Sequence, residues 1–141
     1  MKLRESRHDN VDVFHLAGEI DLHYAPALRG LLHAKATQHC PALVVDLNDV
    51  PFIDSTGISV LIEYLRDASD FGGQFCLAAP TAHVRDVFEI VQLRKALTIF
   101  ESVDDALAAF ADGVVPTPAV SLFTSDNAKE ARGGTTAAQL A

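Results

Sequence analysis

The sequence feature that most constrains the fold is a short, almost continuous apolar run, Ala-Leu-Val-Val-Asp-Leu, at residues 42–47. A run so short and so rich in valine is typical of a central β-strand covered on both faces. The chain then changes to a helical period, with apolar side chains at i, i+3, i+4 and i+7: Ile58, Leu61, Ile62 and Leu65. Gly-Gly at 72–73 ends this pattern, and another apolar strand follows at 74–79. A strand, an amphipathic helix and a strand in succession predict an α/β protein.

The remaining segments extend the predicted order to ββ-α-β-α-β-α-β-α. Before the central strand we expect a strand at 11–17, paired with a first strand near 2–6. A helix with Pro26 in its first turn should follow and end near Gln38. After 74–79 we expect a helix striped by Val84, Val87, Phe88 and Val91, a strand at 97–100, and a last helix that Ser102 and Asp105 open as a capping box. This order predicts a mixed sheet of four or five strands with about four helices packed against it.

Length and composition bound the domain organisation. The chain has 141 residues, 49% of them hydrophobic and 21% charged, which is ordinary for one globular domain. We place that domain at residues 1–112, because the periodicity ends at Gly113 and a low-complexity segment follows. The segment 113–141 is therefore expected to be a flexible tail. The alternative is that its apolar part, 114–123, docks on the domain.

Charge and cysteine usage narrow the class of protein. The formal net charge is −8, and the charged residues of the tail cancel, so the whole excess lies on residues 1–112. Such a surface repels nucleic acid, whose binding needs clustered Lys and Arg. No apolar run approaches the roughly 18 residues of a membrane span, and the start lacks a signal-peptide apolar region, so we expect a cytoplasmic protein. Cys40 and Cys76 lie far apart and are expected to be reduced thiols.

The stretch most informative about function is Val-Pro-Phe-Ile-Asp-Ser-Thr-Gly-Ile at 50–58, between the central strand and the next helix. Its polar residues have a structural interpretation, because Asp54 is well suited to cap that helix. Capping does not account for the two hydroxyls that follow, nor for Gly57 in the first turn, where Ala would favour the helix by about 1 kcal/mol. A glycine there would give a partner close access to the backbone. From the residues alone, the functional and the structural interpretation are equally supported.

Several kinds of site are disfavoured by the motifs that the sequence lacks. The six histidines show no H-E-x-x-H or Cys/His spacing, so we expect no metal. Neither G-x-x-x-x-G-K-[ST] nor G-x-G-x-x-G occurs, which argues against a bound nucleotide, and we expect no cofactor. Ser55 has no His base at a motif distance, and G-x-S-x-G is absent, so a serine hydrolase is disfavoured. We therefore expect a protein that is not an enzyme.

A response-regulator receiver domain is a rival interpretation. Residues 45–48, with Pro51 and Asp54 after them, resemble the phospho-acceptor strand end of receivers. A receiver also needs an acidic pair at the end of an apolar first strand, whereas residues 3–10 are hardly a buried parallel strand. In addition, Lys95 comes before the last predicted strand, whereas the lysine of a receiver follows it.

Three elements, in this order and spacing, resemble a known family: Gly-Glu-Ile-Asp at 18–21, Ala-Pro at 25–26 and Asp-Ser-Thr-Gly at 54–57. The family is that of the bacterial anti-sigma factor antagonists of the STAS fold, and the resemblance covers roughly residues 1–112. Its specific part is Asp-Ser-Thr-Gly. In that family, an anti-sigma factor that is also a kinase phosphorylates the Ser after the Asp. The unphosphorylated antagonist binds that factor and frees the sigma factor, and a serine phosphatase resets the switch.

The resemblance implies a role for five residues of this chain. Ser55 would be the phosphorylation site, and Asp21 would lie close to it. Asp21, Asp54, Ser55, Thr56 and Gly57 would bind the partner, an anti-sigma factor serine kinase. An alternative keeps the fold and changes the partner, as in a STAS accessory subunit of a lipid-transport ABC complex or a stressosome-like scaffold. Such subunits often lack the acceptor, so the intact motif favours the antagonist.

Overall fold

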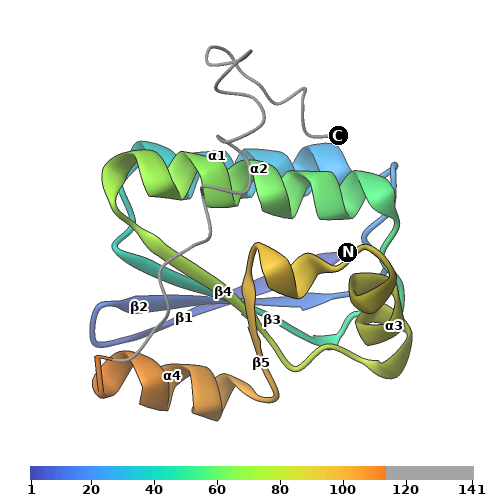
Figure 1. Cartoon of the computed structure of the whole chain (residues 1–141). Helices are drawn as coiled ribbons and strands as arrows, with labels where there is room; N and C mark the ends of the chain where they lie inside the picture. Colours follow the sequence, from blue (N-terminus) through green and yellow to red (C-terminus); the bar gives the residue numbers. More distant parts are fainter. Residues whose placement is uncertain (114–141) are drawn as a thin grey trace.

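Five strands form one sheet in the order β1-β2-β3-β4-β5 (Figure 1). The computed structural model describes residues 1–113. β1 is antiparallel to β2, and the other neighbours are parallel. The strands are β1 (Lys2–His8), β2 (Val11–Ala17), β3 (Ala42–Asp49), β4 (Gln74–Ala78) and β5 (Thr98–Phe100); the helices are α1 (Ala25–Thr37), α2 (Ser55–Phe71), α3 (Ala82–Ile90) and α4 (Val103–Ala111), with a 3-10 turn η1 (Leu93–Lys95). The predicted mixed α/β fold is confirmed.

Helices cover both faces of the sheet. Figure 1 shows α1 and α2 side by side over one face and α4 beneath the other. Side chains alternate along a strand, so Leu43 and Val45 of β3 belong to the core under α1 and α2, whereas Val44 belongs to a smaller core with Ala106 of α4. The prediction that the run 42–47 is a central strand covered on both faces is therefore confirmed.

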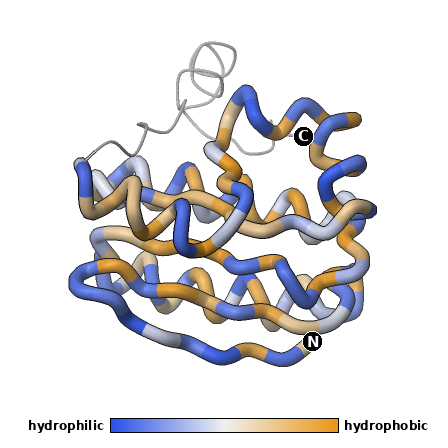
Figure 2. Tube along the Cα trace, turned by 90° about the horizontal axis from the view of Figure 1, so that it is seen from below, coloured by the Kyte–Doolittle hydropathy of each residue, from blue (hydrophilic) through white to orange (hydrophobic). Residues whose placement is uncertain are grey.

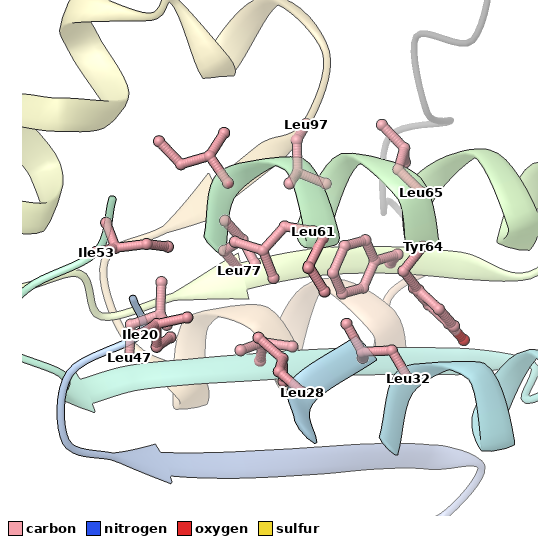
Figure 3. Packing of buried hydrophobic residues seen from close by; sticks show 14 of the residues in the cluster. Ile20, Leu28, Leu32, Leu47, Ile53, Leu61, Tyr64, Leu65, Leu77 and Leu97 are labelled. Carbon is pink, nitrogen blue, oxygen red and sulfur yellow. The ribbon is translucent and has the colours of Figure 1, made fainter. Parts of the chain in front are cut away.

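The larger core reaches the loops at the carboxyl ends of β2 and β3. Figure 3 shows Leu28 of α1 and Leu61 of α2 directed into it, with Ile20 and Ile53 gathered at one end. All four side chains are almost completely buried. Burial of one such side chain contributes roughly 1.5–3 kcal/mol, so the loops that carry Ile20 and Ile53 are anchored by the core.

The helix ends follow the signals in the sequence. Pro26 lies in the first turn of α1. Gly72 adopts a left-handed conformation (φ 78°) and ends α2. Glycine adopts this conformation without steric strain because it has no Cβ. The Ser102 hydroxyl accepts a hydrogen bond of 3.0 Å from the amide of Asp105 and caps α4. Each of these ends was predicted from the sequence.

Several element ends differ from the prediction, among them that of β1, which continues to His8. β3 continues to Asp49, two residues beyond the apolar run, because Asp49 pairs with Ala17 after a register shift between β2 and β3. Val91 was assigned to the buried stripe of its helix, but it lies just past α3 and is 48% exposed. The cause is the next residue, Gln92, whose left-handed backbone (φ 57°) turns the chain away.

The edge strand β1 is polar. Figure 2 shows mainly hydrophilic residues along the strand next to the N-terminus. Charged side chains on an edge strand oppose pairing with other chains. One of them is also structural: Glu5 accepts a hydrogen bond from Lys35 of α1, whose Nζ lies 2.7 Å from Asp12 Oδ2 of β2. Lys35 and Asp12 are both buried, so this ion pair joins α1 to the sheet.

Cys40 and Cys76 are buried free thiols, as predicted. Burial raises the pKa of Cys40 to about 11 and that of Cys76 to about 12, so both are protonated at neutral pH. Among the helices of residues 1–113, none is long and apolar enough to cross a membrane. The predicted tail lies outside the described residues, apart from Gly113.

Candidate functional site

The loops after β2 and β3 are joined by backbone hydrogen bonds. Ile20 and Ile53 form an isolated parallel bridge. The amide of Ile20 donates to the carbonyl of Phe52 at 2.9 Å, and the amide of Asp54 donates to the carbonyl of Ile20 at 3.1 Å. The Gly-Glu-Ile-Asp segment and the Asp-Ser-Thr-Gly segment, more than 30 residues apart in the chain, therefore lie side by side.

Asp54 is the cap of α2, as the structural interpretation predicted. Its Oδ1 accepts hydrogen bonds from the amides of Thr56 (3.0 Å) and Gly57 (3.1 Å), and its Oδ2 accepts one from the amide of Leu22 (3.1 Å). Burial favours the protonated carboxyl, but a hydrogen bond from the Thr56 hydroxyl and these backbone hydrogen bonds outweigh it and hold the pKa of Asp54 below its ordinary value. Asp54 is thus ionised at neutral pH and fully engaged within the chain.

The two hydroxyls after Asp54 differ in their surroundings. The Thr56 hydroxyl donates to Asp54 Oδ1, and its side chain is half-buried. Ser55 is exposed as the first residue of α2, and no hydrogen bond to its hydroxyl is formed within residues 1–113. Ser55 is therefore the hydroxyl that an enzyme from solution can reach without breaking a contact.

The structural reason for a glycine at position 57 differs from the one inferred from the sequence. Gly57 is buried, so it does not open the backbone to a partner. A Cβ at this position would lie 2.7 Å from Ile20 Cγ2, 2.8 Å from Ile53 Cγ1 and 3.0 Å from the Ile20 carbonyl oxygen. Only glycine lets the first turn of α2 approach the bridged loops this closely. The interpretation of Gly57 as an access point was wrong, and close packing accounts for it.

Asp21 holds its own loop in shape. Its Oδ1 accepts hydrogen bonds from the amides of His23 (3.0 Å) and Tyr24 (3.2 Å), and its carbonyl accepts from Tyr24 and Ala25. The next residue, Leu22, is joined to Asp54 as described above. The structure therefore brings the Asp21 loop to the start of α2, while the Asp21 carboxylate itself points to backbone amides of that loop.

Three large apolar side chains stand exposed on these same loops: Leu22 (70%), Tyr24 (36%) and Phe52 (36%). We call them the apolar rim. Phe52 stacks on His83 of α3, with ring centroids 5.3 Å apart. The rim was not predicted from the sequence, because loop residues carry no periodicity that indicates exposure. Its sequence signal is one of position: Leu22 directly follows the Gly-Glu-Ile-Asp motif, and Phe52 lies two residues before the Asp-Ser-Thr-Gly motif.

The family of the chain follows from comparison with known proteins. The family model described as the STAS domain matches residues 3–106. The chain belongs to the STAS domain family. Among curated STAS relatives, the anti-sigma-F factor antagonist RsfB of Mycobacterium tuberculosis is 30% identical over 109 residues, which are 75% of this chain and 86% of the relative. The anti-sigma-B factor antagonist of Listeria monocytogenes is 27% identical over 99 residues, which are 70% and 86% of the two chains.

A solved STAS structure agrees with the fold described above. The crystal structure of an anti-sigma factor antagonist from Mycobacterium paratuberculosis superimposes with a TM-score of 0.71 at 32% identity. The superposition covers 77% of this chain and 92% of the other. Within residues 1–113 of this STAS domain, no group of three or more His, Cys, Asp and Glu side chains is arranged to hold a metal ion.

Proposed function

We propose that this STAS protein is an anti-sigma factor antagonist, a binding module switched by phosphorylation of Ser55. The unphosphorylated form binds an anti-sigma factor serine kinase and releases the sigma factor. Phosphorylation of Ser55 ends that binding, and a serine phosphatase restores it. The observation that carries the proposal is the free hydroxyl of Ser55, exposed at the start of α2 between residues that are fully engaged.

A phosphate on Ser55 should affect partner binding but not folding, because of where Ser55 lies. A phosphate on Ser55 carries a charge of about −1.5 to −2 at neutral pH. It meets the amino end of α2, where an anion is stabilised by roughly 0.3–1 kcal/mol, so the fold tolerates the modification. The same charge lies next to the ionised Asp54. At an interface, an unpaired like-charge group costs several kcal/mol, and each 1.4 kcal/mol lowers affinity tenfold.

The apolar rim supports a protein partner. Leu22 and Tyr24 lie in the loop that is bonded to the cap of α2, and Phe52 lies in the loop that leads to Ser55. A few side chains near the centre of a protein interface carry most of its binding energy, and tyrosine is enriched among them. Asp21 and the exposed Glu19 flank the rim with negative charge. The expected partner surface is therefore apolar with basic groups around it.

The experiment that tests the proposal is phosphorylation by the cognate anti-sigma factor kinase with ATP. Peptide mass mapping should place one phosphate on Ser55, and the modified chain should no longer bind the kinase in a pull-down. Ser55→Ala should accept no phosphate, and the exposed Ser59, one turn further along α2, provides a matched control as Ser59→Ala. A phosphate found on Thr56 would contradict the assignment of the acceptor.

A further inference from the structure

A second polar cluster, which the proposed switch does not use, links three strands of the sheet. Ser6 of β1, His15 of β2 and Asp46 of β3 form a hydrogen-bonded chain. Ser6 Oγ lies 3.0 Å from His15 Nε2, and His15 Nδ1 lies 2.7 Å from Asp46 Oδ2. His15 lies two residues after Val13 and four after Val11, so its side chain is on the same face of β2, the face of the sheet that bears α4. All three side chains of the cluster are half-buried.

Asp46 determines which nitrogen of His15 carries the proton. A carboxylate only accepts hydrogen bonds, so His15 Nδ1 donates to Asp46, and Nε2 of the neutral ring is left as an acceptor. The Ser6 hydroxyl therefore donates to His15 Nε2. Asp46 is held in turn by the amide of Asn48, which donates to Oδ1 at 3.0 Å. The ring is thus oriented to act as a general base toward the Ser6 hydroxyl.

Positive and protonatable groups surround Ser6 on β1. Arg4 and His8 are two residues away on either side, so they share the face of Ser6, and both are exposed. His8 Nε2 lies 3.3 Å from Ser6 Oγ, and Arg4 is the cross-strand partner of His15. Hydrogen-bond donors in these places would stabilise negative charge on an electrophile attacked by Ser6.

We propose that Ser6 is a nucleophile that accepts an acyl group from an activated ester, with His15 as the general base and Asp46 as the residue that positions it. Ser6 Oγ forms a bond to the carbonyl carbon of the ester, and its proton passes to His15 Nε2. The bond between that carbon and the leaving oxygen breaks, and the leaving alcohol takes the proton from His15. The products are acyl-Ser6 and the free alcohol. This step is independent of the proposed switch at Ser55.

The test is labelling of the full chain with a fluorophosphonate, which an activated serine hydroxyl attacks with loss of fluoride. Peptide mass mapping should find one label, on Ser6, and no label on Ser6 after unfolding in guanidinium chloride. His15→Gln removes the base and should slow labelling about 100-fold or more. Asp46→Asn should slow it as well and change its pH profile, because the imidazole loses the partner that fixes its tautomer. Ser59→Ala, at an exposed serine of α2, should be labelled at the wild-type rate.

Either of two results overturns the proposal: a wild-type chain without a label on Ser6, or a folded His15→Gln variant labelled as fast as wild type. If thermal unfolding reveals that His15→Gln does not fold, the proposal is tested on the wild-type chain, by comparing the labelling of Ser6 before and after unfolding. Equal labelling of Ser6 in the folded and the unfolded chain then overturns the proposal, because activation must depend on the folded arrangement. The switch at Ser55 is measured separately by phosphorylation, so the two proposals fail independently.

Discussion

The amide of Leu22 donates a hydrogen bond of 3.1 Å to Asp54 Oδ2, which ties the most exposed apolar side chain of the site to the residue before the acceptor serine. Asp54 Oδ1 accepts hydrogen bonds from the amides of Thr56 and Gly57 in the first turn of α2. One carboxylate therefore fixes the position of Leu22 relative to Ser55. The proposed phosphorylation site and the proposed partner surface are thus joined through the same side chain.

Leu22→Ala should weaken binding of the anti-sigma factor kinase at least tenfold while leaving the fold unchanged. The side chain is 70% exposed, so its truncation removes little contact within the chain. Substitutions at such positions usually change stability by less than about 0.5 kcal/mol. Isothermal calorimetry gives the affinity, and thermal unfolding gives the control. An unchanged affinity would mean that the apolar rim does not contact the partner.

Gly57→Ala should destabilise the domain, although alanine is the better helix former. The new Cβ would meet Ile20 and Ile53 at less than 3.0 Å, and such overpacking costs roughly 1–3 kcal/mol. Gly30→Ala in α1 is the matched control, because no atom other than the backbone of its own helix turn lies within 4 Å of its Cβ position. That substitution should stabilise the domain by about 1 kcal/mol. Urea unfolding of both variants compares the two effects, and equal shifts would contradict the packing argument.

The order of elements was predictable because it depends on strong local patterns. The apolar run 42–47 and the helical period from Ile58 to Leu65 each specify one element without reference to the rest of the chain. Gly72 and Ser102 marked helix ends for the same reason. The position of Val91 was not predictable, since Gln92 adopts the left-handed conformation without being glycine, and no local signal announces that.

The site was predictable as a segment but not as a surface. The resemblance pointed to Asp54 and Ser55, and the cap at Asp54 followed from its place before a helix. The role of Gly57 depends on Ile20, a residue 37 positions earlier, which only tertiary packing brings near. The chain from Ser6 through His15 to Asp46 also crosses three strands, so no spacing in the sequence reveals it.

Asp54→Asn should lower stability at neutral pH, and the difference from wild type should shrink in acid. Asn still caps the helix, but its amide group cannot replace both acceptor oxygens, so the hydrogen bond from Leu22 is lost. The pKa of Asp54 is lowered in the folded state. Its contribution is therefore fully present above the unfolded value of about 3.9 and is lost as the pH falls through the lower, folded pKa. Urea unfolding of both proteins from pH 7 to pH 3 gives this difference, and a constant difference would contradict the assignment.

Truncation after Gly113 should leave both unfolding and kinase binding unchanged. α4 is completed within the described residues, since the Asp112 amide donates to the Ala108 carbonyl and Gly113 follows in a left-handed conformation. The STAS match also ends earlier, at residue 106. Circular dichroism and calorimetry on the shortened chain check this. Loss of cooperative unfolding would mean that residues beyond 113 belong to the core, and loss of binding alone would assign them to the partner surface.

The charge at position 55 should control binding without controlling stability. Ser55→Ala removes the hydroxyl and adds no charge, so the variant should stay bound to the kinase in the presence of ATP. Ser55→Asp should weaken binding, but less than phosphorylation does, because one carboxylate has less charge and fewer acceptor oxygens than a phosphate. Both variants should melt close to wild type, since position 55 is exposed and an added anion faces a helix amino end. The measurement pairs calorimetric affinity with thermal unfolding for each variant. If Ser55→Asp loses affinity only in proportion to lost stability, Ser55 acts as part of the helix end and the proposed switch is wrong.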